Sequence, residues 1–404
     1  MNILVATPSF PALNMGVYDG RFILSEAIAY ARSGAKVRVL TPHFPGAEVV
    51  EEAYNNVMVF RFPYFLPRSY QRLRTPGIPI YKRKTLASAC QIPSLGLMFT
   101  LAILKHALWA DIIHAQWTIT ALLALPAKWL YKRKLVVTAR GTDLRKVPKK
   151  LNQFIHYHVD AAVDCFGLQP LNEWYKHTFT ARFLNLPLVV HIDPCNEMPP
   201  DMKERIRGND EIFKILYVGR FDEFKIEYNK LPIFDLVKAA SILEAKGSNF
   251  HIFYIGGGTK TIEEKLCRFI TTLGLTDRVS PLGTKANPTD YMQFADIGVG
   301  GIAFNAVSQE FTVLGKPQIL MKVPDNVNTP WRDRKNVIFV KPNSVDDLVA
   351  KLLWCFKNRD RLRQIGEAAR KDMAGYMVDS LQGGNIYLES FRKILDMSSR
   401  PLKG

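Results

Sequence analysis

The stretch Ile212–Lys225, IFKILYVGRFDEFK, decides the fold. It begins with an apolar run, Ile212–Val218, that contains one charge and is typical of a buried parallel strand. Gly219 follows, and glycine suits a tight turn because it tolerates positive φ. Arg220 and Lys225 then lie on the loop that leaves the carboxyl end of the strand, where open α/β sheets bind ligands. A planar guanidinium and a mobile ammonium together suit a diphosphate, although a charged surface turn gives the same local pattern.

Strand and helix patterns alternate downstream of this stretch. They predict helices over 231–246, 262–273 and 288–294, and strands over 249–255, 279–282 and 296–299. A further helix begins near Ser308 and carries Glu310 in its first turn, and Gly315 ends it. Helical patterns over 345–356, 360–373 and 384–395 close the chain. Such alternation predicts a doubly wound α/β domain.

The N-terminal half shows the same alternation. Strand patterns over 2–7 and 36–40 flank a glycine-containing loop and a helical pattern over 21–33, and further strands are predicted over 111–115 and 135–138 around a helix at 118–130. Residues 187–209 are rich in proline and lack an apolar period. We therefore predict an N-terminal Rossmann-like domain over 1–193, a linker over 194–211, and a C-terminal Rossmann-like domain over 212–375. Residues 376–404 are predicted to form a helix that crosses back to the first domain.

The composition indicates a basic protein of a reducing compartment. The 404 residues suit two or three domains, and 54 Lys and Arg against 37 Asp and Glu give a net charge of +17. Such a surface attracts phosphates, nucleic acid or anionic lipid. The five cysteines are scattered without metal-ligand or C-x-x-C spacing, which favours the cytoplasm, and the N-terminus has the pattern of a first strand and not of a signal peptide. His156 and His158 have no third metal ligand nearby in the sequence.

A basic, aromatic stretch lies between residues 53 and 110, which contain no Asp or Glu. Its cations are interleaved with aromatic residues over 60–84, a mixture that suits an anionic membrane surface. Single-stranded nucleic acid and a solvated basic loop are alternatives. The apolar run Leu95–Leu104 is too short to span a bilayer and predicts a core helix. The cations predicted to dock on the membrane are Arg68, Arg72, Arg74, Lys82, Arg83 and Lys84.

Three further features of the C-terminal half point to one ligand. Gly256–Gly258 follow a strand and precede a helix, so backbone can approach a ligand there. Asn305 or Ser308 is the expected cap of the next helix, whose amides at Ala306 and Val307 would face an anion. Glu310 only accepts hydrogen bonds and suits ribose or sugar hydroxyls. Cations, a helix N-terminus and a hydroxyl acceptor are what a nucleotide diphosphate-sugar requires.

At this point the sequence resembles a known family. The segments YVGRFDEFK, FYIGGGTKTIEEKL, RVSPLGTKANPTDYMQFADIGV and QEFTVLGKPQIL are similar, in order and spacing, to the C-terminal half of family 4 retaining glycosyltransferases, also called glycosyltransferases group 1. ADIIHAQW and LVVTARGTD resemble members that act on lipid-linked or polysaccharide precursors. The resemblance implies a GT-B fold, in which two Rossmann-like domains face each other across a cleft. It also implies retention at the anomeric carbon without a metal or other cofactor.

The resemblance assigns roles residue by residue. It implies that Arg220 and Lys225 hold the donor diphosphate and that Glu310 meets the ribose, and these three form the catalytic set. It implies a donor site that also contains Gly16, Gly219, Gly256, Gly257, Gly283, Thr284, Asn305, Ala306 and Val307. It places His114, Arg140 and Asp143 on the acceptor side. The sequence departs from the family where a first glutamate is usual, because Ile302 stands eight residues before Glu310, and Arg140 stands where histidine is common.

Three classes of function remain open at this stage. The first is a glycosyltransferase on the cytoplasmic face of the membrane, with a nucleotide-sugar donor and a lipid-linked or saccharide acceptor. The second is a catalytically degenerate nucleotide-sugar binder, which the missing first glutamate favours. The third is a nucleic-acid-binding protein, which only the charge favours, since no RNA- or DNA-binding motif is present.

Overall fold

The computed structural model describes residues 1–12, 15, 19–73, 86–140, 147–164, 182–207, 209, 211–221, 233–302, 305–322 and 329–397. The chain forms two compact units. Residues 1–191 and 378–404 make up the N-terminal unit, and residues 192–377 make up the C-terminal unit. Both units are α/β, which confirms the predicted fold class.

An eight-stranded sheet forms the centre of the N-terminal unit, in the order β3-β4-β2-β1-β5-β6-β7-β8. All neighbouring strands are parallel except β3 and β4, which pair antiparallel as a hairpin. The elements of this unit are β1 (Asn2–Ala6), α1 (Arg21–Arg32), β2 (Lys36–Pro42), β3 (Val50–Tyr54), β4 (Val57–Phe62), a short 3-10 helix (Arg68–Tyr70), α2 (Leu86–Ala89), α3 (Ile92–Ala107), β5 (Ile112–Gln116), α4 (Thr118–Tyr131), β6 (Lys134–Ala139), α6 (Lys149–His158), β7 (Ala161–Asp164), β8 (Arg182–Asn185), β9 (Leu188–Val190) and α16 (Ser380–Leu395).

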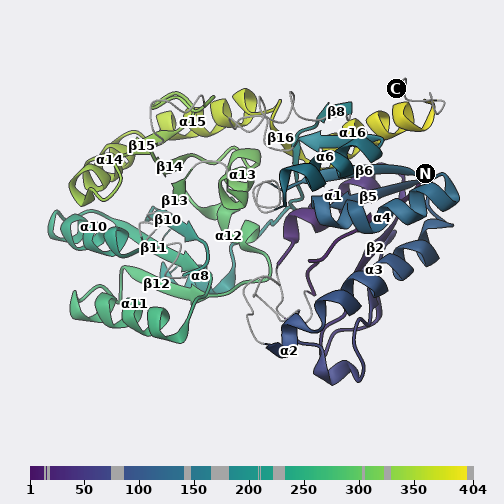
Figure 1. The fold of residues 1–404 in the computed structure, drawn as a ribbon. Coiled ribbons are helices and arrows are strands. Elements are labelled where there is room, and N and C mark those ends of the chain that lie inside the picture. The colour runs from purple at the N-terminus through teal and green to yellow at the C-terminus, as the bar shows by residue number, and fades with distance from the viewer. Residues whose placement is uncertain are drawn as a thin grey trace. The chain divides into compact units, whose positions relative to one another are not determined.

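Helix α16, near the C-terminal end of the described residues, packs on α1 (Figure 1). In α16, Gly384 lies so close to α1 that a Cβ atom there would be 2.0 Å from the Ala29 carbonyl oxygen. The ring of Tyr30 in α1 lies 5.5 Å from that of Tyr387 and 5.7 Å from that of Phe391 in α16. The side chain of Asp379 caps α16 by accepting from the amides at its start. Residues far apart in sequence therefore build one face of the N-terminal unit.

A six-stranded parallel sheet forms the centre of the C-terminal unit, in the order β12-β11-β10-β13-β14-β15. The order reverses direction at β10, as in a doubly wound sheet. The elements of this unit are α8 (Pro200–Arg205), β10 (Phe213–Val218), α10 (Ile233–Ala245), β11 (Phe250–Ile255), α11 (Lys260–Thr272), β12 (Val279–Gly283), α12 (Pro288–Phe294), β13 (Ile297–Ile302), α13 (Ala306–Val313), β14 (Gln318–Met321), β15 (Ile338–Val340), α14 (Val345–Lys357) and α15 (Arg359–Asp372). A short strand, β16 (Met377–Asp379), forms a two-stranded sheet with β9.

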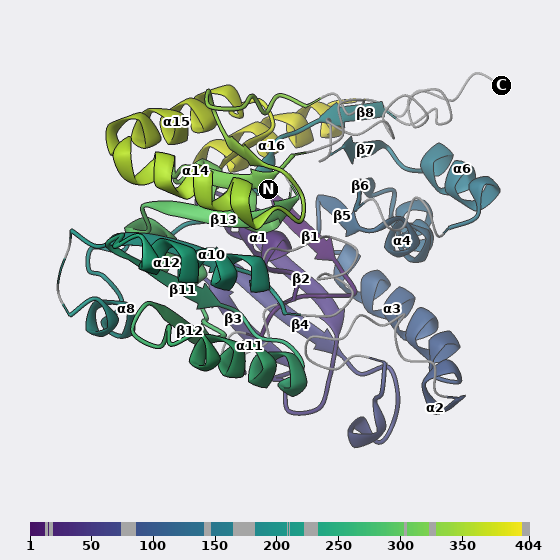
Figure 2. The same cartoon turned by 90° about the vertical axis from the view of Figure 1, so that its left-hand side faces the viewer.

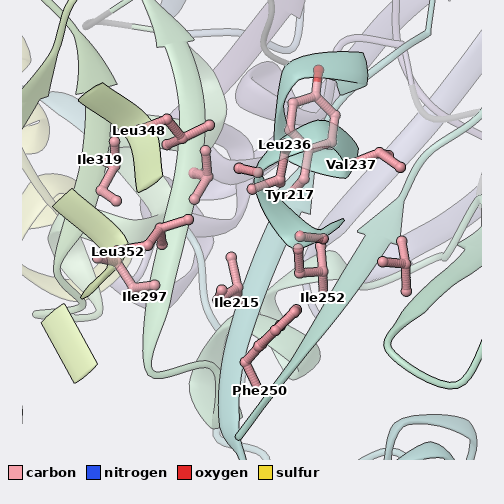
Figure 3. Packing of buried hydrophobic residues seen from close by; sticks show 14 of the residues in the cluster. Ile215, Tyr217, Leu236, Val237, Phe250, Ile252, Ile297, Ile319, Leu348 and Leu352 are labelled. Atoms are coloured by element: carbon pink, nitrogen blue, oxygen red, sulfur yellow. The ribbon is translucent and has the colours of Figure 1, made fainter. Parts of the chain in front are cut away.

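Alternate side chains of these strands enter two separate cores. Figure 3 shows Ile215 and Ile252 in one core, packed beneath side chains of α10 and α14 such as Leu236 and Leu352. Leu216, the next residue after Ile215 in β10, points to the other core, which α8, α12 and α13 cover. Because both faces of the strands are buried, β10 and β11 are almost continuously apolar.

Two predictions about segments need correction. Residues 194–211 contain α8, whose Met202 is completely buried together with neighbouring Ile206, so this part of the predicted linker belongs to the core of the C-terminal unit. The run Leu95–Leu104 was predicted as a core helix, but α3 buries only one side. Leu86–Ala107 is long and apolar enough to span a membrane by length and composition, and 22% of its most apolar 18-residue window is buried. Phe99 and Ile103 enter the core, whereas Leu97 and Leu101 are exposed.

Candidate active site

The carboxyl ends of β10, β11 and β12 meet at one edge of the C-terminal sheet. The amide of Gly219 donates to Ile255 O at 2.9 Å, and the amide of Phe221 donates to Gly257 O at 2.9 Å. The amide of Gly256 donates to Gly283 O, also at 2.9 Å. Exposed Arg220 stands between the two bonded positions of the β10 loop. The predicted donor residues of these three loops are therefore held together by backbone hydrogen bonds.

The glycines after β11 are required by this close approach. A Cβ atom on Gly256 would lie 1.8 Å from the Gly219 carbonyl oxygen, and one on Gly258 would lie 1.9 Å from that of Phe221. Gly256 also has φ +134, a conformation that other residues rarely adopt. These glycines were predicted to admit a ligand, but Gly256 and Gly258 instead give room to the backbone of the neighbouring loop.

The loop after β12 is anchored by a polar cluster. Lys285 Nζ lies 2.6 Å from Asp201 Oδ2, and the Tyr291 hydroxyl donates to the same carboxylate at 2.9 and 3.0 Å. Burial opposes ionisation of Asp201, but the hydrogen bonds from Lys285 and Tyr291 outweigh it and lower the pKa of that carboxyl. This cluster ties the loop that begins at Gly283 and Thr284 to α8 and α12. Asp201 and Tyr291 were missed from the sequence because their partners lie far away along the chain.

The N-terminus of α13 has the predicted cap. Asn305 Oδ1 accepts from the Ser308 amide at 2.9 Å, which identifies Asn305 as the N-cap. An α-helix leaves its first amides, here those of Ala306 and Val307, without intrahelical acceptors. Glu310 is the fifth residue of α13 and lies in its second turn, so its predicted place in the first turn was wrong. Gly315, with φ +67, ends the helix as predicted.

A glycine in β13 fixes the position of α13. A Cβ atom on Gly298 would lie 2.7 Å from the ring of Phe311, which is buried on the inner side of the helix. The helix therefore lies directly on the strand, and its N-terminus is held at the same carboxyl edge as the loops above. Lys225, Gly16 and Asp143 lie outside the described residues.

A buried ionic network lies at the carboxyl edge of the N-terminal sheet. Arg140 follows β6, and its Nη2 donates to Glu26 Oε1 and to Gln116 Oε1, each at 2.6 Å. Gln116 Nε2 donates to the other oxygen of Glu26 at 2.8 Å, and both acceptor side chains are almost completely buried. The Arg140 guanidinium also lies 4.7 Å from the centre of the Phe22 ring. The positively charged guanidinium of Arg140 is therefore held in one orientation by Glu26, Gln116 and the Phe22 ring.

Glu26 and Gln116 were not predicted as site residues, although the sequence carried a signal. Glu26 is a lone carboxylate on the buried side of α1, between Ile23 and Ala27. Gln116 is a polar residue at the end of a completely buried strand. Polar groups at such positions need partners, and each of these two supplies one for the other.

His114 cannot contact an acceptor, which corrects its predicted role. The side chain is completely buried, its Nδ1 lies 3.1 Å from the Tyr30 hydroxyl, and its Nε2 lies 2.7 Å from Thr138 Oγ1. Burial, assisted by the charge of Arg140, lowers the pKa of His114 to about 3, so the ring is neutral. His114 is a core histidine that carries hydrogen bonds between α1, β5 and β6.

The basic, aromatic stretch divides into buried and exposed parts. Arg61 is buried and paired with Glu51 across the β3–β4 hairpin at 2.5 Å, and the Phe62 and Tyr64 rings are in the core. Arg68 and Arg72 are exposed. The predicted docking residues Arg74, Lys82, Arg83 and Lys84 lie outside the described residues. Among the residues that the structure describes, no three His, Cys, Asp or Glu side chains form a group that could hold a metal ion.

Comparisons with known proteins were made on sequence and on structure. Residues 20–164 match the family described as Glycosyl transferase 4-like domain, and residues 200–372 match Glycosyl transferases group 1. No match was found among curated protein sequences.

Solved structures resemble the whole chain. HepE from Anabaena in complex with UDP is 16% identical with a TM-score of 0.67, and 97% of this chain and 100% of that chain are covered. Sucrose-phosphate synthase from Thermosynechococcus elongatus is 17% identical with a TM-score of 0.64 and the same coverage. A glycosyltransferase from Rickettsia africae is 17% identical with a TM-score of 0.65, covering 98% of this chain and 99% of that chain. At such identities these likenesses show the shared fold.

Proposed function

Because the chain belongs to the group 1 glycosyltransferases and has their GT-B fold, we propose that it transfers a sugar from a nucleotide diphosphate-sugar to a saccharide or lipid-linked acceptor. We take UDP-sugars as the first donors to test, since the structure of HepE contains UDP. Transfer with retention at the anomeric carbon is part of the proposal, as is diphosphate binding by side chains of the protein without a metal ion.

One observation carries the proposal. Backbone hydrogen bonds and the cap of α13 bring Arg220, the loops at Gly256 and Gly283, and a helix N-terminus to one edge of the C-terminal sheet. The amides of Ala306 and Val307 attract an anion because they lack intrahelical acceptors and lie at the positive end of the helix dipole. Together with Arg220 and Lys225, they would bind the diphosphate.

The same groups would assist the chemical step. As the bond from the sugar to the diphosphate breaks, negative charge grows on the leaving phosphate oxygen, and fixed cations stabilise it more than they stabilise the intact donor. Glu310 would accept hydrogen bonds from the ribose hydroxyls, and Gly283 and Thr284 would lie beside the base. The backbone amides at the start of α13 and the loop that carries Arg220 do not need to change position for this, because the cap and the backbone hydrogen bonds already hold them.

On the acceptor side we propose Arg140 as the residue that orients an acceptor hydroxyl or anionic group, with Glu26 and Gln116 holding its guanidinium in place. A reducing compartment, the cytoplasm, fits the four cysteines that the structure describes, since all four are free thiols. A lipid-linked acceptor would place the enzyme at the inner face of the membrane.

Thermal shift with UDP, GDP, ADP and dTDP, each with and without magnesium, tests the donor site. A nucleotide present at 100 times its dissociation constant adds about 2.7 kcal/mol to the free energy of unfolding, which is easily measured. We expect one nucleotide to stabilise the protein equally with and without magnesium. Stabilisation only with magnesium would refute metal-independent binding, and no stabilisation by any of the four would refute a donor site that forms without acceptor.

A non-catalytic nucleotide-sugar binder is a second candidate, because Ile302 stands where the family usually has its first glutamate. An active glycosyltransferase turns over the nucleotide-sugar, whereas a non-catalytic binder does not. A donor that binds with no hydrolysis and no transfer to any saccharide or lipid-linked acceptor would favour the binder, and release of free nucleoside diphosphate in the presence of an acceptor would favour the enzyme.

A further inference from the structure

The helices α3, α4 and α6 lie side by side on one face of the N-terminal sheet (Figures 1 and 2). Their inner sides enter the core, where Ile103 of α3, Leu125 of α4 and Ile155 of α6 are buried. Arg133 Nη2, just after α4, donates to the carbonyl oxygen of Leu108 at the end of α3, and the Trp129 ring of α4 packs on His158 of α6. The outward sides of the three helices therefore form one continuous surface, which we call the α3–α4–α6 surface.

This surface is apolar where it faces outward. Leu97 and Leu101 lie at helical spacing on α3, opposite its buried side, and Leu108 follows on the same side at the C-cap of the helix. Trp129 and Leu130 continue it on α4, and Phe154 and Tyr157 continue it on α6. Each of these seven side chains is 44–66% exposed. Single exposed apolar residues are normal, but a contiguous set of leucines and aromatic rings marks an interaction site.

The charge on this surface has a single sign. No residue of α3, α4 or α6 is Asp or Glu, and all three helices are described in full. Lys105, Lys132, Lys149 and Lys150 are exposed at the ends of these helices. The nearby carboxylate of Asp160 is neutralised by Lys128, whose Nζ lies 2.5 Å from it. The apolar surface is therefore bordered by cations.

Exposed Arg68 and Arg72 extend this cationic border. The Gln91 side chain, just before α3, donates to Tyr70 O at 2.9 Å and accepts from the Arg72 amide at 3.0 Å. The segment that carries Arg68 and Arg72 is thus fixed at the start of α3. Tyr70 adds another exposed ring at this end.

We propose that the α3–α4–α6 surface docks the enzyme on an anionic lipid bilayer, with the helices lying in the interface. Leucines and aromatic rings enter the boundary between headgroups and acyl chains, while lysines reach the phosphates. The α3 helix lies on the bilayer and does not cross it, because Phe99 and Ile103 hold its other side in the core. A second copy of the chain is a poorer occupant, since a two-fold interface would bring the same lysines against each other.

This inference does not depend on the donor or acceptor, so it can fail while the proposed transfer holds. The test is sedimentation of the full chain with vesicles of phosphatidylcholine alone or with about 30% phosphatidylglycerol. We expect binding only to the anionic vesicles, and weaker binding when NaCl rises from about 0.1 to about 0.5 M. The triple variant Leu97→Gln, Leu101→Gln, Trp129→Gln should lower the partition coefficient at least about tenfold.

Matched controls separate this surface from general effects. Val49→Gln, Val50→Gln, Leu381→Gln changes three exposed apolar residues elsewhere in the same unit and should bind vesicles as the wild type does. The lysines of the surface are compared with an equal number of exposed lysines in the C-terminal unit. Changing Lys105, Lys132, Lys149 and Lys150 to Gln should weaken binding about a hundredfold, and changing Lys246, Lys260, Lys265 and Lys357 to Gln should weaken it far less.

Three results would overturn the proposal. The first is equal vesicle binding by the triple variant and the wild type, with both retaining the wild-type melting temperature. The second is equal loss of binding in the two lysine variants, which would show that net charge and not this surface is responsible. The third is a dimer in light scattering that the triple variant converts to a monomer while no vesicle binding is seen, which would make the surface an interface between copies.

Discussion

Replacing Gly256 with alanine tests whether the loop after β11 fixes the loop that carries Arg220. The new Cβ atom would lie 1.8 Å from the Gly219 carbonyl oxygen, and ordinary contact begins at 3.4 Å. The difference, 3.4 minus 1.8, means that the two loops must separate by 1.6 Å. Because Gly219 immediately precedes Arg220, this separation moves the cation that the proposed mechanism places on the diphosphate.

The Gly256→Ala substitution is expected to lower the free energy of unfolding in two ways. Alanine at φ +134 adds about 1–3 kcal/mol of backbone strain, and overpacking adds about 1–3 kcal/mol. In a unit of this size each kcal/mol lowers the melting temperature by about 2–4 °C, so a fall of about 4–24 °C is expected. A displacement above about 1 Å at a reacting group lowers kcat/KM by roughly 10².

Gly274→Ala is the matched control, because Gly274 also has positive φ, +68, but no atom lies within 4 Å of its Cβ position. Its expected cost is about 1 kcal/mol from backbone strain alone, with no effect on turnover. Differential scanning calorimetry and calorimetric titration with the nucleotide identified by thermal shift measure both variants. If the Gly256→Ala variant has the same melting temperature as the Gly274→Ala variant and the nucleotide affinity of the wild type, Gly256 does not fix the loop that carries Arg220.

Four further predictions concern single groups. Arg220→Ala should lower kcat by roughly 10²–10³, the scale for losing one preorganised charge, and near-wild-type steady-state kinetics would refute its role. Glu310→Gln should mainly weaken donor affinity, and unchanged calorimetric affinity would refute a contact with ribose. Glu26→Ala should lower the urea-derived free energy of unfolding by about 3–5 kcal/mol, because Arg140 stays buried without its carboxylate, and a loss below about 1 kcal/mol would contradict this. Since the folded-state pKa of His114 is about 3 against 6.5 when exposed, its contribution to stability is present above pH 6.5 and is lost as the pH falls toward 3. Urea unfolding at stepped pH should show a slope of about 1.4 kcal/mol per pH unit from this residue, which His114→Asn should remove.

The fold was predictable because its strands are buried on both faces. Apolar runs such as Phe213–Val218 and Phe250–Ile255 need no knowledge of their neighbours to be recognised. The predicted bounds of α12, 288–294, agree with the structure, since Pro288 stands at the first position of the helix and marks its start. Local signals of this kind depend only on adjacent residues.

The hairpin of β3 and β4 was missed although its turn was visible. Asn55 and Asn56 form a two-residue connection, and Asn56 adopts φ 65, as such turns require. The mixture of cations and aromatic residues around Arg61 led instead to the prediction of a membrane-docking surface. Composition cannot distinguish a buried arginine from an exposed one, because its partner Glu51 lies on the neighbouring strand.

The residues of the candidate site also fall into two groups, those that local sequence signals identify and those that depend on distant partners. The cap at Asn305 follows from local backbone geometry and was identified from the sequence, whereas the loop that requires Gly256 comes from the neighbouring strand. The state of His114 and the network of Glu26, Gln116 and Arg140 depend on which strands are neighbours in the sheet. Such pairings join residues up to 114 positions apart, and no local pattern encodes them.

The packing of α16 on α1 has a consequence for how the protein is made. Tyr30 leaves the ribosome long before its partners Tyr387 and Phe391 are synthesised. At about 5–20 residues per second, roughly 20–70 s separate the synthesis of the two helices. During that interval the side of α1 that packs on α16 is uncovered, so the nascent N-terminal unit should be a substrate for chaperones until α16 has been synthesised. The C-terminal unit, whose residues 192–377 are contiguous, can fold first.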